Sequence, residues 1–259
     1  MQNNNKSSGA EDYFEGKNGK AVLIIHGFGG HVSQTDILVE YLHGKGHTVV
    51  RPVLKGHRDY TDLHKCEPGD WICEIDYWIN NLSNKFDSIY LIGISFGGNL
   101  ALLKATANNP KIKGIITMET PIYFNSKIAF MLNVVQPVLD FFNIEKIRKN
   151  RFWYRKNYAD PRDKSVSCPF IPVKTVGLVN KYVQECRKQI SFVKVPVLAV
   201  QAEDSDLICK KSADYIVDNC SSAIKEKYLV PINNHDLDLM DESGKILMLQ
   251  KINSFIERV

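Results

Sequence analysis

The sequence predicts an α/β fold in which a mostly parallel central sheet has helices on both faces and carries a small inserted helical lid. Near-continuous apolar runs alternate with segments whose apolar residues recur at helical spacing. Uninterrupted apolar strands are typical of parallel sheets that are covered on both faces. One long aromatic-rich segment interrupts the alternation and predicts the lid, because a structureless loop of that length is uncommon in a compact domain.

The first part of the core is expected at residues 17–120. Residues 1–16 are expected to be a disordered tail, because their start is polar and rich in Asn and Ser. Within the core, Trp71, Ile75 and Ile79 show the helical spacing that predicts an amphipathic helix. The expected strands cover residues 21–25, 47–53, 88–94 and 113–118, and the expected helices cover residues 36–43, 68–82 and 96–107.

The lid is expected at residues 121–174, and the second part of the core at residues 175–259. In that second part we expect helices at 175–190, 212–219 and 245–256, and strands at 195–201 and 225–230. The lid aromatics are Tyr123, Phe124, Phe130, Phe141, Phe142, Phe152, Trp153, Tyr154 and Tyr158. Most should pack the lid on the core, while a few, among them Phe124 and Phe130, should line a substrate pocket.

Length and composition indicate an ordinary globular protein. The chain has 259 residues, of which 44% are apolar and 24% charged. A net charge of +4 is too mild, and too scattered, to predict nucleic-acid binding. No secretory signal precedes residue 20 and no apolar run reaches the roughly 18 residues of a membrane span, so we expect a cytoplasmic protein without stable membrane insertion. The six cysteines contain no C-x-x-C pair, so a zinc or thioredoxin-like site is not expected. The oligomeric state is open.

A predicted nucleophile lies in the motif Gly93-Ile94-Ser95-Phe96-Gly97. The bare pattern is a weak signal, but here it follows a buried strand and opens a helix. A sharp turn at that place would raise the Ser95 hydroxyl above the sheet. Ser95 is therefore the expected nucleophile of an acyl transfer.

A predicted oxyanion loop follows the first strand, in the motif His26-Gly27-Phe28-Gly29-Gly30. Acyl transfer needs two N–H groups aimed at the developing oxyanion, and we expect them from Phe28 and from Phe96. Gly27 and Gly29 would let the backbone approach the substrate. For His26 we favour a structural role, in which it holds the loop by hydrogen bonds, over proton transfer.

The expected general base is His235, in a loop after the last strand. The other histidines at 31, 43, 47, 57 and 64 precede Ser95. When a strand–serine–helix turn carries the nucleophile, the chain order is serine, acid, histidine. His235 is also at the carboxyl end of a strand, where the sites of open α/β sheets gather.

With these motifs the chain resembles the small bacterial carboxylesterase and monoacylglycerol lipase family of the α/β-hydrolase fold, from about residue 20 to the end. The matching segments are HGFGG at 26–30, LKGH at 54–57, Asp70-Trp71, GISFGG at 93–98, TMETP at 117–121 and QAEDSDLI at 201–208. The resemblance implies a serine carboxylesterase that hydrolyses short- to medium-chain esters or monoglycerides through an acyl-enzyme on Ser95. It also implies that no metal or organic cofactor is required, and that a short lid follows the strand at 113–118.

The sequence departs from that family at the catalytic acid. Aligned without gaps, Ser205 stands at the family's acid position, and a serine cannot supply the negative charge that stabilises an imidazolium. We prefer Asp206 as the acid, because it is next to the matched position. Glu119, at the end of an earlier strand, and Asp204 are alternatives, and the acid could also be absent.

Two other functions stay open at this point. One is a thioesterase or acyltransferase that uses the same site, and the other is a hydrolase-fold binding protein whose catalysis is weakened by Ser205.

Overall fold

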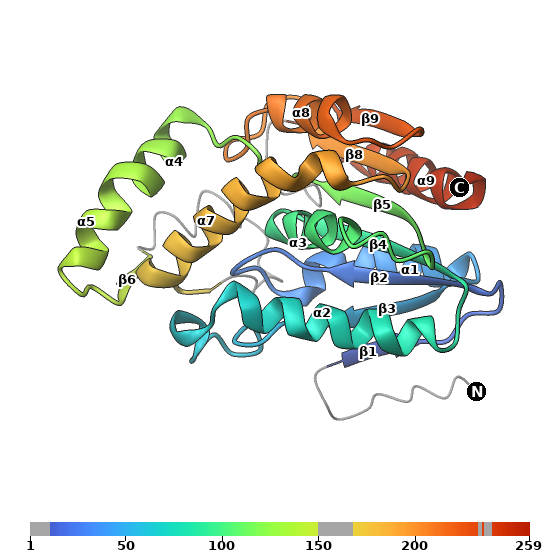
Figure 1. Ribbon diagram of the computed structural model, residues 1–259, viewed down its shortest axis with the longest axis horizontal. Helices are drawn as coiled ribbons and strands as arrows, with labels where there is room; N and C mark the ends of the chain where they lie inside the picture. Colours follow the sequence, from blue (N-terminus) through green and yellow to red (C-terminus); the bar gives the residue numbers. More distant parts are fainter. Residues whose placement is uncertain (1–10, 150–167, 233–234, 236–239) are drawn as a thin grey trace.

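Seven strands form one sheet in the order β1-β3-β2-β4-β5-β8-β9 (Figure 1). The computed structural model describes residues 11–149, 168–232, 235 and 240–259. The strands are β1 (Glu11–Phe14), β2 (Lys20–Ile25), β3 (Thr48–Pro52), β4 (Ser88–Ile94), β5 (Ile112–Met118), β8 (Val197–Ala202) and β9 (Lys225–Val230). All neighbours are parallel except β1, which pairs antiparallel with β3. The predicted mostly parallel sheet is therefore confirmed.

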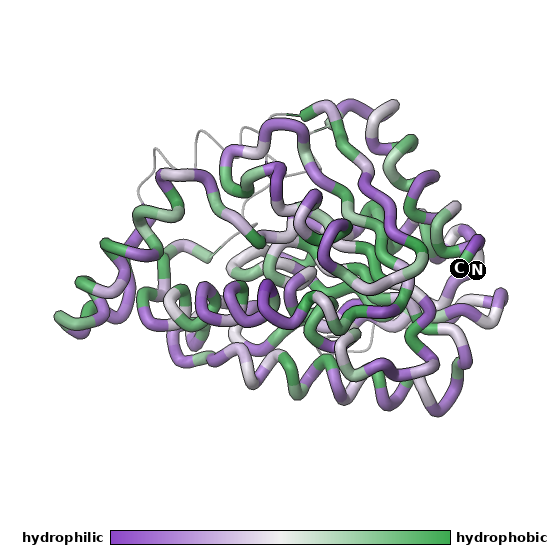
Figure 2. Tube along the Cα trace, turned by 45° about the horizontal axis from the view of Figure 1, so that its top comes forward, coloured by the Kyte–Doolittle hydropathy of each residue, from purple (hydrophilic) through white to green (hydrophobic). Residues whose placement is uncertain are grey.

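Helices cover both faces of the sheet (Figure 1). Along β2, Leu23 and Ile25 pack in one apolar cluster while Val22 and Ile24 pack in the other. Alternate residues of a strand point to opposite faces, so an apolar run is required where both faces are covered. The green band on the central strands in Figure 2 reflects these runs.

Different helices cover the two faces of the sheet. The first cluster contains residues of α2 (Pro68–Ser83), α3 (Phe96–Ala105), α7 (Val173–Gln189) and α8 (Lys211–Asn219), and the second contains residues of α1 (Asp36–Gly44) and α9 (Glu242–Arg258). Short 3₁₀ turns occur at Val32–Thr35, Leu63–Lys65 and Ile190–Phe192. Each of the six helices and six core strands predicted from periodicity is present, with ends that differ by a few residues at most.

The N-terminal segment differs from the prediction. Residues 11–14 belong to the predicted disordered tail, yet they form β1 at the edge of the sheet. The buried Arg51 of β3 donates to the carboxylates of Asp12 and Asp36. This charge pairing stabilises the edge strand, and the sequence of β1, two acidic residues followed by two aromatic ones, does not reveal it. Residues 1–10 lie outside the described part.

The segment predicted as a lid leaves the sheet after β5. It contains α4 (Ser126–Phe130), a π-turn (Met131–Val135), α5 (Gln136–Phe141), β6 (Lys146–Arg148) and β7 (Phe170–Pro172). Figure 1 shows α4 and α5 beyond the end of the sheet, with α7 beside them. The antiparallel pair β6–β7 was not predicted, because each strand has only three residues. Four of the aromatics, Phe152, Trp153, Tyr154 and Tyr158, lie outside the described residues.

Candidate active site

Ser95 lies at a sharp turn between β4 and α3. Its backbone has φ 52° and ψ −125°, a conformation that L-residues rarely adopt. The Ser95 N–H donates to the carbonyl of Met118 at 2.7 Å, which ties the turn to the neighbouring strand β5. Such strain persists where the surrounding structure enforces it, and it is frequent at active sites.

The two motif glycines are required by the close approach of other backbone. A Cβ added at Gly97 would lie 2.2 Å from the carbonyl oxygen of Ile25, and one at Gly93 would lie 2.4 Å from the carbonyl oxygen of Gly97. The turn at Ser95 is thereby packed directly against the end of β2, from which the loop 26–30 emerges.

Glu119 occupies the matching place on the next strand. Ile94 and Met118 are register partners of the parallel pair β4–β5, so Ser95 and Glu119 are the residues that follow paired positions. Glu119 also has a positive φ, 49°, and its side chain is fully buried. One carboxylate oxygen, Oε1, accepts hydrogen bonds from the Gln201 side-chain amide and from the backbone N–H of Ala202.

The imidazole ring of His235 contacts this carboxylate. Its Nδ1 lies 3.1 Å from Oε2 of Glu119, and its side chain is 24% exposed. Since an ionised carboxylate only accepts hydrogen bonds, Nδ1 carries the proton and Nε2 is left with a lone pair. This is the tautomer that a general base needs.

Asp206, the acid preferred from the sequence, contacts His235 in a different way. Its Oδ1 accepts from the backbone N–H of His235 at 3.0 Å. Among the three candidate acids, Glu119 is the one whose carboxylate has a described bond to the imidazole ring. Asp204 is exposed, and its own N–H donates to the carbonyl of Ile232.

Ser205 closes a tight turn in the loop after β8. Its hydroxyl accepts from the backbone N–H of Ile208 at 3.2 Å, and its carbonyl accepts from the Asn125 side chain at 2.9 Å. Ser205 is buried. A serine at this position is therefore explained by the local hydrogen bonds of the turn.

The loop 26–30 passes directly over the serine. A Cβ at Gly27 would lie 3.1 Å from Cβ of Ser95, so the backbone of this loop lies close to the serine. His26 Nδ1 donates to the Gly27 carbonyl at 2.9 Å, while His26 Nε2 accepts from the N–H of Leu54 at 3.0 Å. Because a trans peptide directs its N–H opposite to its carbonyl, the bond from His26 turns the N–H of Phe28 away from the His26 ring. The structural role predicted for His26 agrees with these contacts.

A second histidine, to which the sequence assigned no role, braces the same loop. His57 Nε2 accepts from the N–H of Gly29 at 3.0 Å, and His57 Nδ1 donates to the carbonyl of Lys55 at 3.2 Å. Burial lowers the pKa of His26 to about 4 and that of His57 to about 3. Both rings are thus neutral at pH 7, as their acceptor roles require. The sequence shows the segment LKGH at 54–57, but it does not show that His57 in this segment bonds the loop 26–30.

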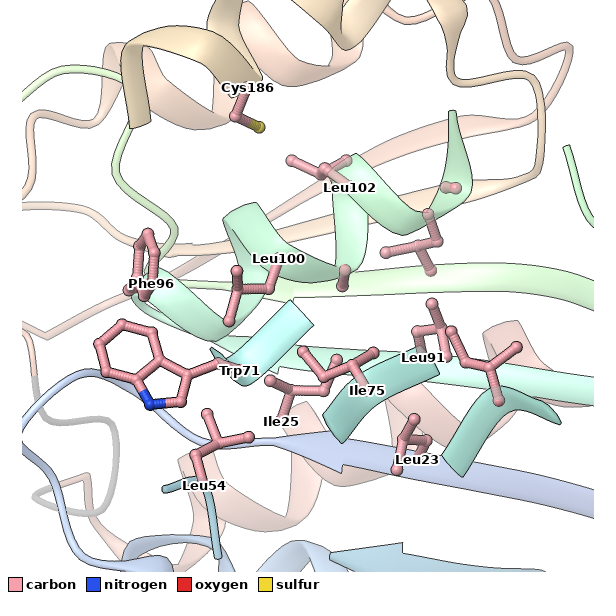
Figure 3. Close-up of a cluster of buried hydrophobic side chains, with 14 of the residues drawn as sticks. Leu23, Ile25, Leu54, Trp71, Ile75, Leu91, Phe96, Leu100, Leu102 and Cys186 are labelled. Carbon is pink, nitrogen blue, oxygen red and sulfur yellow. The ribbon is translucent and has the colours of Figure 1, made fainter. Parts of the chain in front are cut away.

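Trp71 supports both residues that are expected to supply the oxyanion N–H groups. Its ring centroid lies 5.7 Å from that of Phe28 and 5.7 Å from that of Phe96. Figure 3 shows Phe96 directly beside the Trp71 indole, with Leu54 and Leu100 nearby. The indole N–H donates to the carbonyl of Lys55 at 2.9 Å. A single buried side chain of α2 therefore packs against both the loop 26–30 and the start of α3.

The residues that are expected to contact the substrate differ in burial. Gly29 is in the loop described above, and its N–H is taken by His57. Phe124 is partly buried against the core and bridges to Ile208, whereas Phe130 on α4 is 59% exposed.

The described residues contain no group of three or more His, Cys, Asp or Glu side chains placed to hold a metal ion. Within the same part of the chain, no helix combines the length and the apolarity that crossing a bilayer requires.

Comparison with known proteins gives consistent matches. Residues 16–242 match the family model described as serine aminopeptidase, S33. A carboxylesterase of Bacillus subtilis (strain 168) is 25% identical over 241 residues, which cover 92% of this chain and 89% of that protein. A thermostable monoacylglycerol lipase of Bacillus sp. (strain H-257) is 24% identical over 220 residues, 85% of this chain and 84% of the lipase.

A solved structure supports the fold. It comes from work on LipS and LipT, two metagenome-derived lipolytic enzymes, and it superposes with a TM-score of 0.81 at 22% identity, covering 97% of this chain and 99% of that one. The sheet and helices described above are those of an α/β-hydrolase.

Proposed function

This chain belongs to the serine aminopeptidase S33 family of hydrolases, and on that premise we propose that it is a serine carboxylesterase acting on short- to medium-chain esters or monoglycerides. The observation that carries the proposal is the bond of 3.1 Å between His235 Nδ1 and Glu119 Oε2, with Glu119 beside Ser95 at the ends of two paired strands. The curated relatives support ester hydrolysis over peptide hydrolysis, since their names are carboxylesterase and monoacylglycerol lipase.

In the first step, the Ser95 oxygen attacks the ester carbonyl. His235 Nε2 takes the hydroxyl proton, and the imidazolium that forms faces the Glu119 carboxylate. The N–H groups of Phe28 and Phe96 receive the oxyanion. When the tetrahedral intermediate collapses, the bond to the leaving alcohol breaks and His235 returns its proton to the alcohol oxygen.

In the second step, water replaces the alcohol. His235 takes a proton from the water as its oxygen attacks the acyl carbon. Collapse of this second intermediate breaks the bond to Ser95, which recovers its proton from His235, and the carboxylic acid leaves. The fully buried Glu119 keeps its charge next to His235 throughout.

The role of the acid is thus proposed for Glu119 in place of Asp206. This assignment weighs against the alternative of a binding protein with weakened catalysis, because that alternative depended on the absence of an acid at Ser205. A buried carboxylate bonded to the imidazole provides what the turn around Ser205 lacks.

We also propose that residues 121–174 form the lid of this site. Their helices α4 and α5 lie beyond the end of the sheet in Figure 1, and Phe124 packs at the root of the segment. The acyl chain would lie between the lid and the loop 26–30.

The test compares Ser95→Ala with Ser88→Ala, which changes a serine at the opposite end of the same strand. With p-nitrophenyl butyrate, S95A should lose turnover and S88A should keep it. Mass spectrometry should find a fluorophosphonate adduct on Ser95 in the parent chain. Full turnover by S95A would exclude the mechanism.

A substrate panel tests the class of reaction. Esters and monoglycerides of varied chain length should be cleaved faster than the matching thioesters and than aminoacyl anilides. A preference for thioesters would favour the thioesterase alternative, transfer of the acyl group to an added alcohol would favour an acyltransferase, and a preference for anilides would favour a peptidase.

A further inference from the structure

Gln201 is a buried polar residue within an apolar strand. It is 1% exposed, and its neighbours along β8, Val200 and Ala202, are also buried. A primary amide loses its hydrogen bonds to water when it is buried, so its place in the core needs a partner. That partner is Oε1 of Glu119, which accepts from Gln201 Nε2.

The Glu119 carboxylate is surrounded by three donors. Oε1 receives the side chain of Gln201 and the backbone N–H of Ala202, and Oε2 faces His235. Donors to a carboxylate favour its charged form, whereas burial disfavours it. The N–H of Ala202 belongs to the backbone, so Gln201 supplies the side-chain donor that the sequence can change.

We propose that Gln201 is a positioning residue of the ester hydrolysis: its hydrogen bond to Oε1 holds the Glu119 carboxylate in place, directed at His235, without touching the substrate. The inference rests on the proposed function and deepens it. It explains how a carboxylate at the end of β5 can serve as the acid when the loop after β8 carries Ser205 at the family position.

The charged and titratable groups around this contact come from two loops. His235 faces Glu119 from the loop after β9. Asp206, on the loop after β8, is directed at the backbone N–H of His235, while Glu203 and Asp204 on the same loop are exposed. Gln201 therefore bonds the Glu119 carboxylate at Oε1, while His235 bonds it at Oε2.

The experiment measures kcat and KM for p-nitrophenyl butyrate between pH 5 and 9 in Gln201→Met, Gln201→Glu and Glu119→Gln. Gln189→Met is the matched control, because Gln189 also donates to a carboxylate, that of Glu185, but at the end of α7. Q201M should lower kcat at least tenfold with KM unchanged, and the acidic limb of kcat should move to higher pH. Without the amide donor, Glu119 takes a proton more readily, and the protonated pair is inactive.

Q201E provides the second readout and is nearly isosteric. While the introduced carboxyl group and that of Glu119 share one proton, that proton replaces the amide N–H and activity should persist. Activity should then decline as the pH rises and the shared proton is lost, which adds an alkaline limb that the parent lacks. If Q201M does not fold, this alkaline limb decides the proposal.

The outcomes separate the two proposals. Parental kcat and pH profile in Q201M, or a parental profile in Q201E, together with an inactive E119Q, would overturn the role of Gln201 and leave Glu119 as the acid. Parental activity in E119Q would overturn both. A loss of kcat in Q189M as large as that in Q201M would mean that general destabilisation explains the effect. This result would also overturn the inference.

Discussion

Ser95 and Glu119 stand at equivalent positions on adjacent parallel strands, and both have a positive φ, 52° and 49°. The serine lies at the turn between β4 and α3, and the carboxylate is directed to the imidazole of His235. Two strained residues of this kind, side by side, indicate a site in which backbone geometry sets the direction of both side chains.

The first prediction concerns the acid itself. Glu119→Gln should reduce kcat by roughly 10⁴-fold, because a neutral amide leaves the imidazolium without a counter-charge and can select the wrong tautomer. KM for p-nitrophenyl butyrate should stay within about twofold, since Glu119 is fully buried and reaches the substrate through His235 alone.

A second substitution distinguishes relocation of the acid from its loss. Ser205→Asp restores a carboxylate at the family's acid position, so the double variant E119Q/S205D should be more active than E119Q. A parental kcat in E119Q would contradict the assignment of Glu119 whatever the double variant does.

The second prediction distinguishes a carboxylate that bonds the ring of His235 from one that bonds its backbone N–H. Asp206 accepts from the His235 backbone N–H, and an amide oxygen can accept the same bond. Asp206→Asn should therefore keep kcat near the parental value, while Asp206→Ala should lower it about tenfold, the effect of one lost hydrogen bond. If Asp206 were instead the catalytic acid, D206N would be as damaging as D206A, because an amide carries no charge.

The sheet was predictable from the sequence, whereas the contact between Glu119 and His235 could be given only as one of several alternatives. Apolar runs such as residues 21–25 and 88–94 appear as buried strands because both faces of this sheet are covered. Nothing in the sequence states that Ile94 and Met118 are register partners. Without that register, Glu119 is one of several carboxylates that follow strands, and its nearness to Ser95 stays hidden.

The contacts that brace the loop 26–30 were also beyond sequence reasoning. His26 was predicted to hold its own loop, but its acceptor contact is with Leu54, and His57 returns a contact to Gly29. The exchange depends on two loops that are distant in sequence and adjacent at the sheet edge. Sequence patterns report periodicity within an element, and they do not report contacts between loops.

The third prediction concerns Trp71, whose ring contacts both Phe28 and Phe96. Trp71→Phe keeps an aromatic ring but removes the N–H bond to Lys55 and part of the packing. We expect kcat to fall about tenfold, less than the roughly 10²- to 10³-fold cost of losing an oxyanion donor outright. Trp78→Phe, on the same helix, is the control, because only W71F should lose kcat. Equal kcat values in both variants would separate Trp71 from the oxyanion loop.

The fourth prediction concerns pH and stability. In the folded chain, burial lowers the pKa of His57 to about 3 and that of His26 to about 4, from an ordinary value of 6.5. Below pH 6.5 the unfolded chain therefore binds protons that the folded chain refuses. The stability that these neutral rings confer is complete above pH 6.5, and it is lost progressively as the pH falls toward the two lowered values.

Removing one of these histidines should make the free energy of unfolding depend less on pH. In His57→Gln, the side-chain oxygen can still accept from Gly29 and the amide can still donate to Lys55, so the loop keeps its braces without a titrating group. Between pH 7.5 and 5, the free energy of unfolding measured in urea should fall by roughly 2 kcal/mol less in H57Q than in the parent, from about 1.4 kcal/mol per pH unit for one proton. His43→Gln, which changes an exposed histidine, should follow the parent. If H57Q shows the parental pH dependence, protonation of His57 is not what destabilises the fold in acid.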